Sequence, residues 1–416
     1  TLSNGKKVFF YGGLPSEKIL VEVYKNKKDY ALANLVEVIE KNPNRIPPED
    51  KEIYLSTSPF QILNYEYELF AKKSIIKEAF QKEKINLNID RIFTDNNEFH
   101  YRNKMEYSFY FNNENNKLYL AFFMRGKHYK IPFIKESLAK NEINNFAFKV
   151  LNFLNEKKID GRKIKSLLVR ANKNGLVKGQ LYLKDEKLFE ELASKKYIEN
   201  NLEFIFSNPN SPASIISKRI NKNKQSLEDE ILGIRFRYSV ESFFQINLPL
   251  YEEVLKDIMK FSFLTHKNIV DFYSGVGTIG LTLFKNRGKA NIKILFVEID
   301  KSSCVELEKN IIENFNNELG SLMVINANTD SVLNYIKKDE ILVVDPPRAG
   351  LSKKVIMKIK EIRPLRLIYL SCNPITQARD IGCLKDCYNI IFNKGYNFFP
   401  RTVHIENLVV LDADNK

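Results

Sequence analysis

Apolar and polar residues follow three different patterns along the chain. Over the first 50 residues, apolar and polar side chains alternate in short runs, as in residues 19–23 and 31–38, and turn residues separate the runs. A period of two predicts half-buried strands, and short strands between turns are typical of a small antiparallel barrel. We therefore expect an OB-like β-barrel over residues 1–50, ending in a proline-rich stretch that includes Pro47 and Pro48.

Helical spacing marks the next segment, residues 51–90. Apolar side chains three or four positions apart predict a helix over residues 64–81, which follows a linker. Strand-like runs and turns then dominate, and we expect hairpin loops at Asn112-Asn113 and at Lys173-Asn174-Gly175. This pattern predicts a strand-rich central domain over residues 91–240.

Strands and helices alternate over residues 241–416. The expected strands span residues 268–272, 293–297, 324–325, 341–344, 367–370 and 403–411. One expected helix begins at Ile279 and another covers residues 305–314. Such alternation predicts an α/β fold with a doubly wound, mostly parallel sheet. In sheets of this kind, functional groups gather at the carboxyl ends of the strands.

The composition is typical of a globular protein without membrane-spanning helices. The chain has 416 residues, 44% hydrophobic and 28% charged, and no apolar run approaches the roughly 18 residues of a membrane helix. We expect a cytoplasmic protein that does not contact a membrane, and we expect a monomer. The formal net charge of +14 favours a polyanionic partner such as RNA, although a general lysine bias would give the same charge.

The four cysteines are candidate metal ligands or nucleophiles. The four cysteines contain no Cys-x-x-Cys pair and have no histidine cluster beside them, so no metal site is expected. Cys383 and Cys387 lie four residues apart on an expected helix, and we expect both to be packing residues. Cys372 is a candidate nucleophile instead, because it directly follows an expected strand.

A glycine-rich turn follows the strand at residues 268–272. Gly275, Gly277 and Gly280 give the spacing G-x-G-x-x-G, and Glu298 closes the next strand. Glycines allow close approach of the backbone to a ligand, and an acidic residue at that strand end can accept hydrogen bonds from ribose hydroxyls. The pattern favours a nucleoside cofactor over an empty tight turn. It does not separate a dinucleotide from S-adenosylmethionine.

Two further strand ends carry reactive groups. Asp345 begins an Asp-Pro-Pro-Arg segment, and Cys372 lies in Ser-Cys-Asn-Pro. Two prolines make a stiff turn that could aim the Asp345 carboxylate at a planar ring, or leave it as a helix cap. A cysteine at a strand end is more often buried and inert. As a thiolate, however, Cys372 could add to C6 of a uracil and make C5 nucleophilic enough to accept a methyl group.

That chemistry also needs a base and a site for the pyrimidine. Glu406 and His404 lie on the expected last strand, and alternation places both on one face, so spacing does not choose between them. Upstream, a phenylalanine of the Phe243-Phe244 pair could stack on a flipped base, and the Gln245 amide could contact a uracil edge or a cofactor.

Together, these segments resemble the RNA uridine-5 methyltransferase family, which includes bacterial tRNA and 23S ribosomal RNA enzymes. The matching stretches are Phe-Phe-Gln-Ile-Asn, Asp-Phe-Tyr-Ser-Gly-Val-Gly-Thr-Ile-Gly-Leu, Val-Asp-Pro-Pro-Arg-Ala-Gly-Leu, Leu-Ser-Cys-Asn-Pro and His-Ile-Glu-Asn-Leu. The resemblance implies a class I Rossmann-like methyltransferase domain that uses S-adenosylmethionine and has an antiparallel last strand. It also implies a TRAM-type RNA-binding barrel at the amino end and RNA as the partner.

The resemblance also implies roles for individual residues. Cys372 would be the nucleophile and Glu406, rather than His404, the acceptor of the C5 proton; Asp345 would face the uracil or the cofactor. Cofactor-pocket positions would be Gln245, Tyr273, Gly275, Gly277, Thr278, Glu298, Asn328 and Asp345. Many members carry four cysteines for an iron–sulfur cluster, but residues 53–67 contain none, so no such cluster is expected.

Three alternatives stay open at this point. A nicotinamide-dependent dehydrogenase would explain the glycine turn but not Cys372, Asp345 and Glu406. An RNA-binding or RNA-folding protein with a decayed active site is a second reading, against which the presence of those three residues counts. An RNA cytosine-5 methyltransferase shares the chemistry but fits the Asp-Pro-Pro-Arg and Ser-Cys-Asn-Pro pair less well. The sequence does not identify the RNA.

Overall fold

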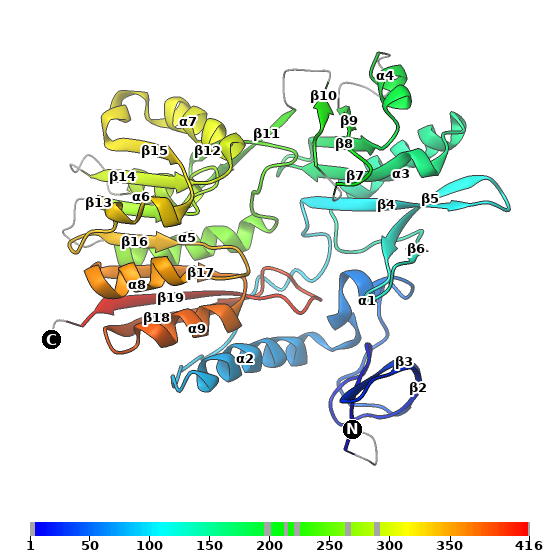
Figure 1. The fold of residues 1–416 in the computed structure, drawn as a ribbon, viewed down its shortest axis with the longest axis horizontal. Helices are drawn as coiled ribbons and strands as arrows, with labels where there is room; N and C mark the ends of the chain where they lie inside the picture. Colours follow the sequence, from blue (N-terminus) through cyan, green and yellow to red (C-terminus); the bar gives the residue numbers. More distant parts are fainter. Residues whose placement is uncertain are drawn as a thin grey trace.

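The computed structural model describes residues 5–194, 201–211, 215–219, 225–262, 268–286 and 292–414. Three sheets of three, seven and seven strands and one separate hairpin follow one another along the chain (Figure 1). Within the described ranges, no helix has both the length and the apolar character needed to cross a membrane.

The amino-terminal segment forms a three-stranded sheet in the order β1-β3-β2. Its strands are β1 (Lys7–Phe9), β2 (Lys18–Asn26) and β3 (Tyr30–Glu40). β2 pairs antiparallel with β3, as the alternation predicts, but β1 pairs parallel with β3. The expectation of purely antiparallel pairing is wrong for β1, because the chain crosses from one edge of the sheet to the other between β1 and β2.

The central segment contains a seven-stranded sheet in the order β10-β9-β8-β7-β4-β5-β6. Its strands are β4 (Lys104–Asn112), β5 (Lys117–Phe123), β6 (Lys130–Pro132), β7 (Ile164–Ala171), β8 (Val177–Leu183), β9 (Leu202–Phe206) and β10 (Lys218–Arg219). Both expected hairpin loops are confirmed, since β4 turns into β5 after Asn112 and β7 turns into β8 through Gly175, which has a φ of +80°.

Two helices also lie in the central segment, α3 (Asn141–Glu156) and α4 (Glu186–Ser194). The sequence pattern did not predict α3, because Asn and Phe, which dominate it, are weak helix formers. Tertiary packing overrides that preference: one face of α3 is buried in the core beneath the sheet through Ile143, Ala147, Val150, Leu151 and Leu154.

The carboxyl-terminal sheet has seven strands in the order β15-β14-β13-β16-β17-β19-β18. Its strands are β13 (Asn268–Phe272), β14 (Lys293–Glu298), β15 (Leu322–Asn326), β16 (Ile341–Val344), β17 (Arg366–Ser371), β18 (Tyr388–Tyr396) and β19 (Glu406–Ala413). The first five in spatial order are parallel, and β19 runs antiparallel to both of its neighbours. The expected α/β fold with an antiparallel last strand is therefore confirmed.

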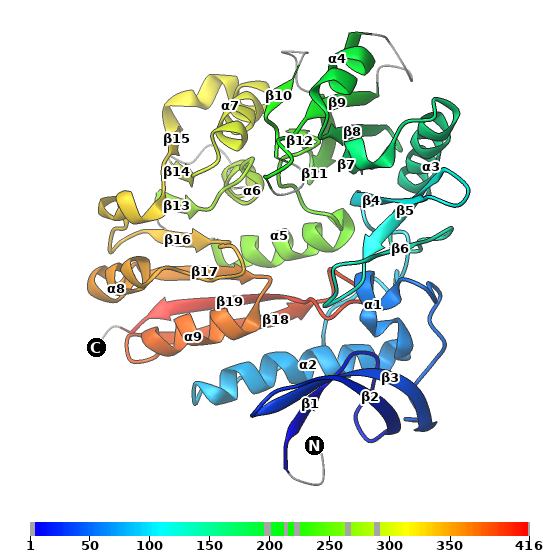
Figure 2. The ribbon, with the colours of Figure 1, turned by 45° about the vertical axis from the view of Figure 1, so that its right-hand side comes forward.

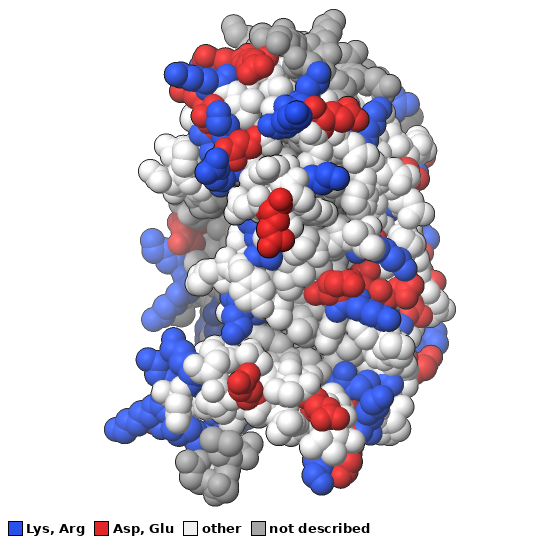
Figure 3. Space-filling model, turned by 90° about the vertical axis from the view of Figure 1, so that its right-hand side faces the viewer, with Lys and Arg blue, Asp and Glu red and all other residues white. Residues whose placement is uncertain are grey.

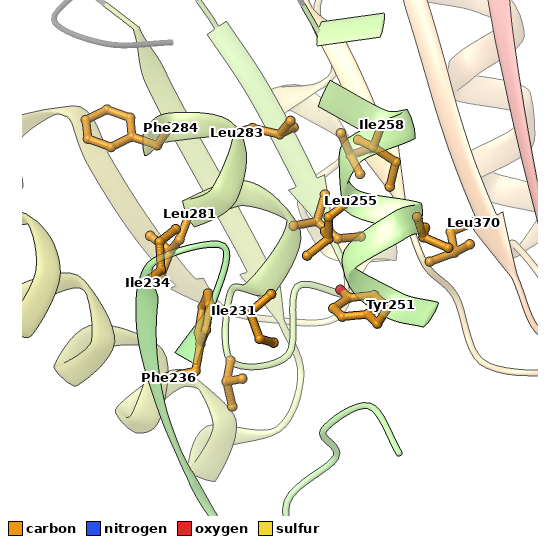
Figure 4. Close-up of a cluster of buried hydrophobic side chains, with 14 of the residues drawn as sticks. Ile231, Ile234, Phe236, Tyr251, Leu255, Ile258, Leu281, Leu283, Phe284 and Leu370 are labelled. Carbon is orange, nitrogen blue, oxygen red and sulfur yellow. The ribbon is translucent and has the colours of Figure 1, made fainter. Parts of the chain in front are cut away.

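Helices cover both faces of this sheet, and strand residues alternate between the two cores. Ile269, Val343 and Ile368 point to the core shared with α5, α6 and α7, whereas Val270, Leu342 and Leu367 point to the core shared with α2, α8 and α9. Figure 4 shows part of the first core. The helices are α2 (Tyr65–Lys82), α5 (Leu248–Ser262), α6 (Thr278–Asn286), α7 (Lys301–Phe315), α8 (Lys353–Ile362) and α9 (Pro374–Leu384).

The helix α2 and the hairpin β11–β12 come from earlier parts of the chain but pack against this carboxyl-terminal sheet. Figure 2 shows α2 running alongside α9, and the helix buries Ile76 and Phe80 in the second core. The hairpin strands are β11 (Ser226–Ile231) and β12 (Ile234–Ser239), and the hairpin buries Phe236 in the first core.

Short helical turns complete the structure. They are α1 (Tyr54–Thr57) and the 3₁₀ turns η1 (Pro59–Ile62), η2 (Gly161–Lys163), η3 (Asn316–Ser321), η4 (Thr329–Ser331) and η5 (Leu333–Tyr335).

Candidate active site

A cleft of about 1930 Å³ lies where the carboxyl ends of β13, β14, β16 and β17 meet. The residues that the sequence singled out come together there from separate strands. Those that line the cleft are Gln245, Tyr273, Gly275, Glu298, Asn328, Asp345, Cys372 and Glu406. Parallel strands place their carboxyl ends at one edge of the sheet, which explains how Tyr273 after β13 and Cys372 after β17 can meet although they lie far apart in the sequence.

Two expected cofactor residues do not line this cleft. The hydroxyls of Thr278 and Tyr251 share a hydrogen bond of 2.6 Å, and Thr278 borders a separate cavity of about 30 Å³. At Gly277 the φ is +87°, and a Cβ there would lie 2.3 Å from Cδ1 of Leu307. Gln245, Tyr273 and Gly275 of the main cleft also line that small cavity, and a contact of Gly277 or Thr278 with the cofactor stays a prediction.

The glycines of the turn are expected to respond differently to substitution. At Gly275 the φ is +56° and a Cβ would meet no atom within 4 Å, whereas a Cβ at Gly277 would collide with Leu307. We expect Gly277→Ala to lower the free energy of unfolding by about 1–3 kcal/mol through overpacking and left-handed strain. Gly275→Ala should cost about 1 kcal/mol but weaken binding of S-adenosylhomocysteine. Denaturant unfolding and calorimetric titration would check both; equal destabilisation by the two variants would contradict this account.

Glu298 at the end of β14 is fixed by the backbone around it. Its carboxylate accepts hydrogen bonds from the amide of Gly275 at 2.9 Å and from the amide of Asp300 at 2.8 Å. One oxygen is used for each amide, and a carboxylate has about four lone-pair sites. Glu298 can therefore still accept hydrogen bonds from a pair of ribose hydroxyls in the cleft.

Asp345, which is partly exposed, and Glu406, which is buried, form a pair of neighbouring carboxyl groups. Burial raises the pKa of Asp345 to about 7. Burial, and then the nearby charge of Asp345, raise the pKa of Glu406 well above its usual range, while Arg348 opposes the shift. Two carboxyl groups close together in a site of low polarity cannot both ionise easily, so the pair can hold and release a proton near neutral pH.

Cys372 follows β17 directly and is partly buried. Burial, followed by the charges of Glu406 and Asp345, raises the pKa of its thiol to about 11, and Arg348 acts in the opposite direction. The resting side chain is therefore a thiol, and the structure places carboxyl groups close enough to affect its proton. This environment differs from that of an inert core cysteine, because the thiol faces a cleft and charged groups.

Hydrogen bonds tie the Asp-Pro-Pro-Arg loop to the start of α9. The carbonyl of Arg348 accepts hydrogen bonds from Nδ2 of Asn373 at 2.9 Å and from the hydroxyl of Thr376 at 3.1 Å. The amide of Leu351 donates to the carboxylate of Asp380 at 2.8 Å. These bonds fix the loop that carries Asp345 against the loop that carries Cys372.

His404 is placed differently from the sequence expectation. The last strand begins at Glu406 rather than near residue 403, so His404 lies in the preceding turn and does not share a strand face with Glu406. Burial and the charge of Arg348 lower the pKa of His404 to about 4, so its ring is neutral and accepts a hydrogen bond from Nη2 of Arg348. Glu406 lines the cleft, whereas His404 supports Arg348 from outside it.

The structure corrects the expectation for one cysteine and adds Arg219 to the site. Cys387 is buried, as expected, but Cys383 is exposed and lines the cleft, because α9 turns that position away from the sheet. Phe243 lines the cleft with 68% of its surface exposed. Arg219 of the central sheet closes one wall, which no local sequence signal indicated.

Comparison with known proteins identifies the family. A profile described as tRNA (uracil-5-)-methyltransferase matches residues 64–414. The chain belongs to this family. Its members are RNA (uracil-5-)-methyltransferases that use S-adenosylmethionine, so the methyltransferase interpretation and the family resemblance are confirmed.

Relatives and solved structures extend the match over the full chain. An uncharacterized RNA methyltransferase of Caldanaerobacter subterraneus subsp. tengcongensis is 30% identical over 98% of this chain and 94% of its own length. One of Fusobacterium nucleatum is 28% identical over 97% and 90%. The crystal structure of Pyrococcus abyssi tRNA (uracil-54, C5)-methyltransferase in complex with S-adenosyl-L-homocysteine superimposes with a TM-score of 0.76 at 20% identity, covering 98% and 96%. The same fold therefore spans both chains.

The cleft fits the cofactor of the family. Gly275 leaves open space where a side chain would stand, and Glu298 offers a fixed carboxylate at the adjacent strand end. The exposed side chain of Ile299 and the exposed residue Asn328 line the same cleft. In the binding mode proposed below, these residues would hold the ribose and the adenine of S-adenosylmethionine.

Proposed function

We propose that this protein methylates C5 of a uridine in structured RNA, a tRNA or 23S ribosomal RNA loop, through a covalent bond between Cys372 and C6. The observation that carries the proposal is the meeting of Cys372, Asp345 and Glu406 in one cleft with Glu298 and Gly275. C5 of a pyrimidine is nearly inert until C6 is attacked, so a nucleophile beside a methyl-donor site is the main chemical requirement.

Cys372 forms the first bond in the proposed reaction. Its thiolate adds to C6, and the electron pair of the C5–C6 double bond moves to C5 and the C4 carbonyl oxygen as an enolate. S-adenosylmethionine, when bound, supplies the electrophilic methyl group that C5 takes up, and S-adenosylhomocysteine is the leaving group. The guanidinium of Arg348 favours the thiolate, since it counteracts the rise in the thiol pKa.

Glu406 completes the proposed reaction as the base. As a carboxylate it accepts the proton from C5; the double bond then reforms and Cys372 leaves as a thiolate. Asp345 would bind the polar edge of the uracil, and its proximity keeps the affinity of Glu406 for a proton high. Gln245 would contact the base, and the exposed ring of Phe243 would stack on a neighbouring nucleotide.

The remaining expected residues and regions have supporting roles in this proposal. The residues that would contact the cofactor are Tyr273, Gly275, Gly277, Thr278, Glu298 and Asn328. The amino-terminal sheet would be part of a TRAM-type barrel and would bind RNA together with the central sheet. On the face shown in Figure 3, basic and acidic side chains are interspersed, so shape as well as charge would select the RNA. A monomeric, cytoplasmic enzyme without an iron–sulfur cluster stays a prediction.

Methyl transfer is expected to accelerate as pH rises. The reactive forms are the Cys372 thiolate and the Glu406 carboxylate, and the pKa values of Cys372 and Asp345 are raised to about 11 and about 7. Both shifts keep these groups protonated to a larger extent at neutral pH, so the single-turnover rate constant should climb from roughly pH 6 to pH 9.

Arg348→Met should move this rise in the rate constant to higher pH, because the Cys372 thiol loses its neighbouring cation. A rate that falls over that range would contradict the assignment.

The base preference and the cofactor can be tested together. RNA loops whose only pyrimidine is uridine should accept label from methyl-labelled S-adenosylmethionine, and matched loops with cytidine should not. Thermal shift with S-adenosylhomocysteine should exceed that with NAD, because the family to which the chain belongs uses S-adenosylmethionine. Label in the cytidine loops alone would favour the cytosine-5 alternative.

A further inference from the structure

We infer that a buried ion pair on α2, Glu68 with Lys72, positions Glu406 for removal of the C5 proton. It does so by fixing residues 397–405, the segment that joins β18 to β19, which we call the base turn. The inference rests on the proposed role of Glu406. Lys72 and Glu68 lie more than 320 residues before the base turn, and neither lines the cleft.

Lys72 uses all three of its protons on fixed acceptors. Its Nζ donates to the Glu68 carboxylate at 2.8 Å, to Oδ1 of Asn397 at 2.5 Å and to the carbonyl of Phe399 at 2.9 Å. The side chain is fully buried. Two of the three acceptors belong to the base turn, so Lys72 joins α2 to the beginning of that turn.

Glu68 holds the middle of the base turn through Arg401. The Glu68 carboxylate accepts a hydrogen bond from the amide of Arg401, with its two oxygens at 3.0 and 3.1 Å from the nitrogen. The φ of Arg401 is +65°, a left-handed conformation that a side chain other than glycine adopts at a cost. The Arg401 guanidinium in turn donates to the carbonyl of Leu63 at 2.6 Å and is paired with Glu98. The surroundings therefore impose an unusual backbone conformation.

The base turn leads directly into the site. Phe399 lines the cleft, His404 accepts a hydrogen bond from Arg348, and Glu406 is the first residue after the turn. The hydroxyl of Tyr101 also fixes the turn by donating to the carbonyl of Pro400 at 3.0 Å. A displacement of the turn would therefore move the proposed base, the support of Arg348 and one wall of the cleft together.

A role in positioning Glu406 explains the buried ion pair of Glu68 and Lys72 better than a role in stabilising the fold does. Replacing a buried ion pair with apolar side chains is often neutral or stabilising, so two buried charges are weak evidence for a purely stabilising role. A misplacement of about 1 Å at a reacting group can cost about 100-fold in rate. Because Glu406 acts after the methyl group has been transferred, the defect should appear at a specific step.

The expected defect is slow release of the covalent complex. With Lys72→Met, bond formation by Cys372 and methyl transfer should continue, while loss of the C5 proton should slow by about 10- to 100-fold. Methyl label should then stay attached to the protein on a denaturing gel, with less label in free RNA. General destabilisation would lower both signals and would not change their ratio.

The test uses the full chain, total RNA lacking uridine-5 methylation and methyl-labelled S-adenosylmethionine. Lys73→Met is the matched control on α2, because Lys73 donates to the carbonyl of Asp90 on the surface and, among the described residues, makes no hydrogen bond or ion pair with the base turn. Arg366→Met removes a buried cation at the far end of β17, paired with Asp412, and controls for lost stability. Neither control should raise the ratio of protein-bound to free label.

The outcomes separate this inference from the proposed function. If Lys72→Met does not fold, Asn397→Ala tests the same link, because it removes one acceptor of Lys72 and keeps the ion pair. Suppose that the folded Lys72 or Asn397 variant shows the wild-type ratio of protein-bound to free label, while Glu406→Gln shows a raised ratio. The positioning role is then overturned, but the proposed role of Glu406 as the base is kept. A wild-type ratio in Glu406→Gln itself removes the proposed base and the inference with it.

Discussion

Replacing Cys372 with Ala should abolish methyl transfer, with a loss of at least ~10⁴-fold. Without addition at C6, C5 of uracil has too little electron density to attack a methyl group, so no slower route replaces the thiol. The hydrogen bonds that fix Glu298 and the loop after Asp345 do not involve the sulfur, so binding of S-adenosylhomocysteine should stay close to wild type. Transfer of labelled methyl groups to unmethylated RNA, followed over time, measures the loss.

Cys383 provides the matched control for that experiment. It is a second thiol that lines the same cleft and is more exposed than Cys372. Because it lies on α9, away from Asp345 and Glu406 at the strand ends, Cys383→Ala should transfer methyl groups at the wild-type rate. Loss of activity in Cys383→Ala with activity kept in Cys372→Ala would reverse the assignment of the nucleophile.

Replacing Glu406 with Gln should trap the enzyme on its RNA. Gln keeps the size of the side chain but cannot take the C5 proton, so turnover should fall by about 10²–10⁴-fold. Bond formation by Cys372 and methyl transfer precede that step. The variant should therefore carry methyl label and RNA through a denaturing gel, whereas Cys372→Ala should carry neither.

His404→Asn distinguishes the two candidate bases. Because His404 accepts a hydrogen bond from Arg348, its loss should slow formation of the covalent complex rather than its release. Accumulated complex in His404→Asn, with normal release in Glu406→Gln, would identify the histidine as the base.

The strand ends were the most predictable part of the structure. Apolar runs that stop at Asp345 and Cys372 are local signals, and the parallel sheet brings such ends together whatever the rest of the fold. The start of the last strand was less predictable. Hydrogen bonds from the amide and the hydroxyl of Thr402 to the carbonyl of Phe399 close a turn, so residues 403–405 stay outside β19 despite their apolar pattern.

Features that depend on distant parts of the chain could not be found by local reasoning. The parallel pairing of β1 depends on a crossover, and α3 forms because a sheet covers its apolar face. Likewise, the hydrogen bond between the hydroxyls of Thr278 and Tyr251 joins α6 to α5, and no local pattern predicts it. The role proposed for Glu68 and Lys72 depends on their contacts with a turn more than 320 residues away, which no local pattern around α2 predicts.

The most direct test of the central claim is mapping of the methylated product. Total RNA lacking uridine-5 methylation is incubated with labelled S-adenosylmethionine and either the wild-type enzyme or Cys372→Ala, then digested and sequenced. We predict 5-methyluridine at one or a few loop positions with the wild-type enzyme only, and those positions would identify the RNA. Binding of the RNA without any methyl transfer, or equal transfer by Cys372→Ala, would contradict the proposed mechanism.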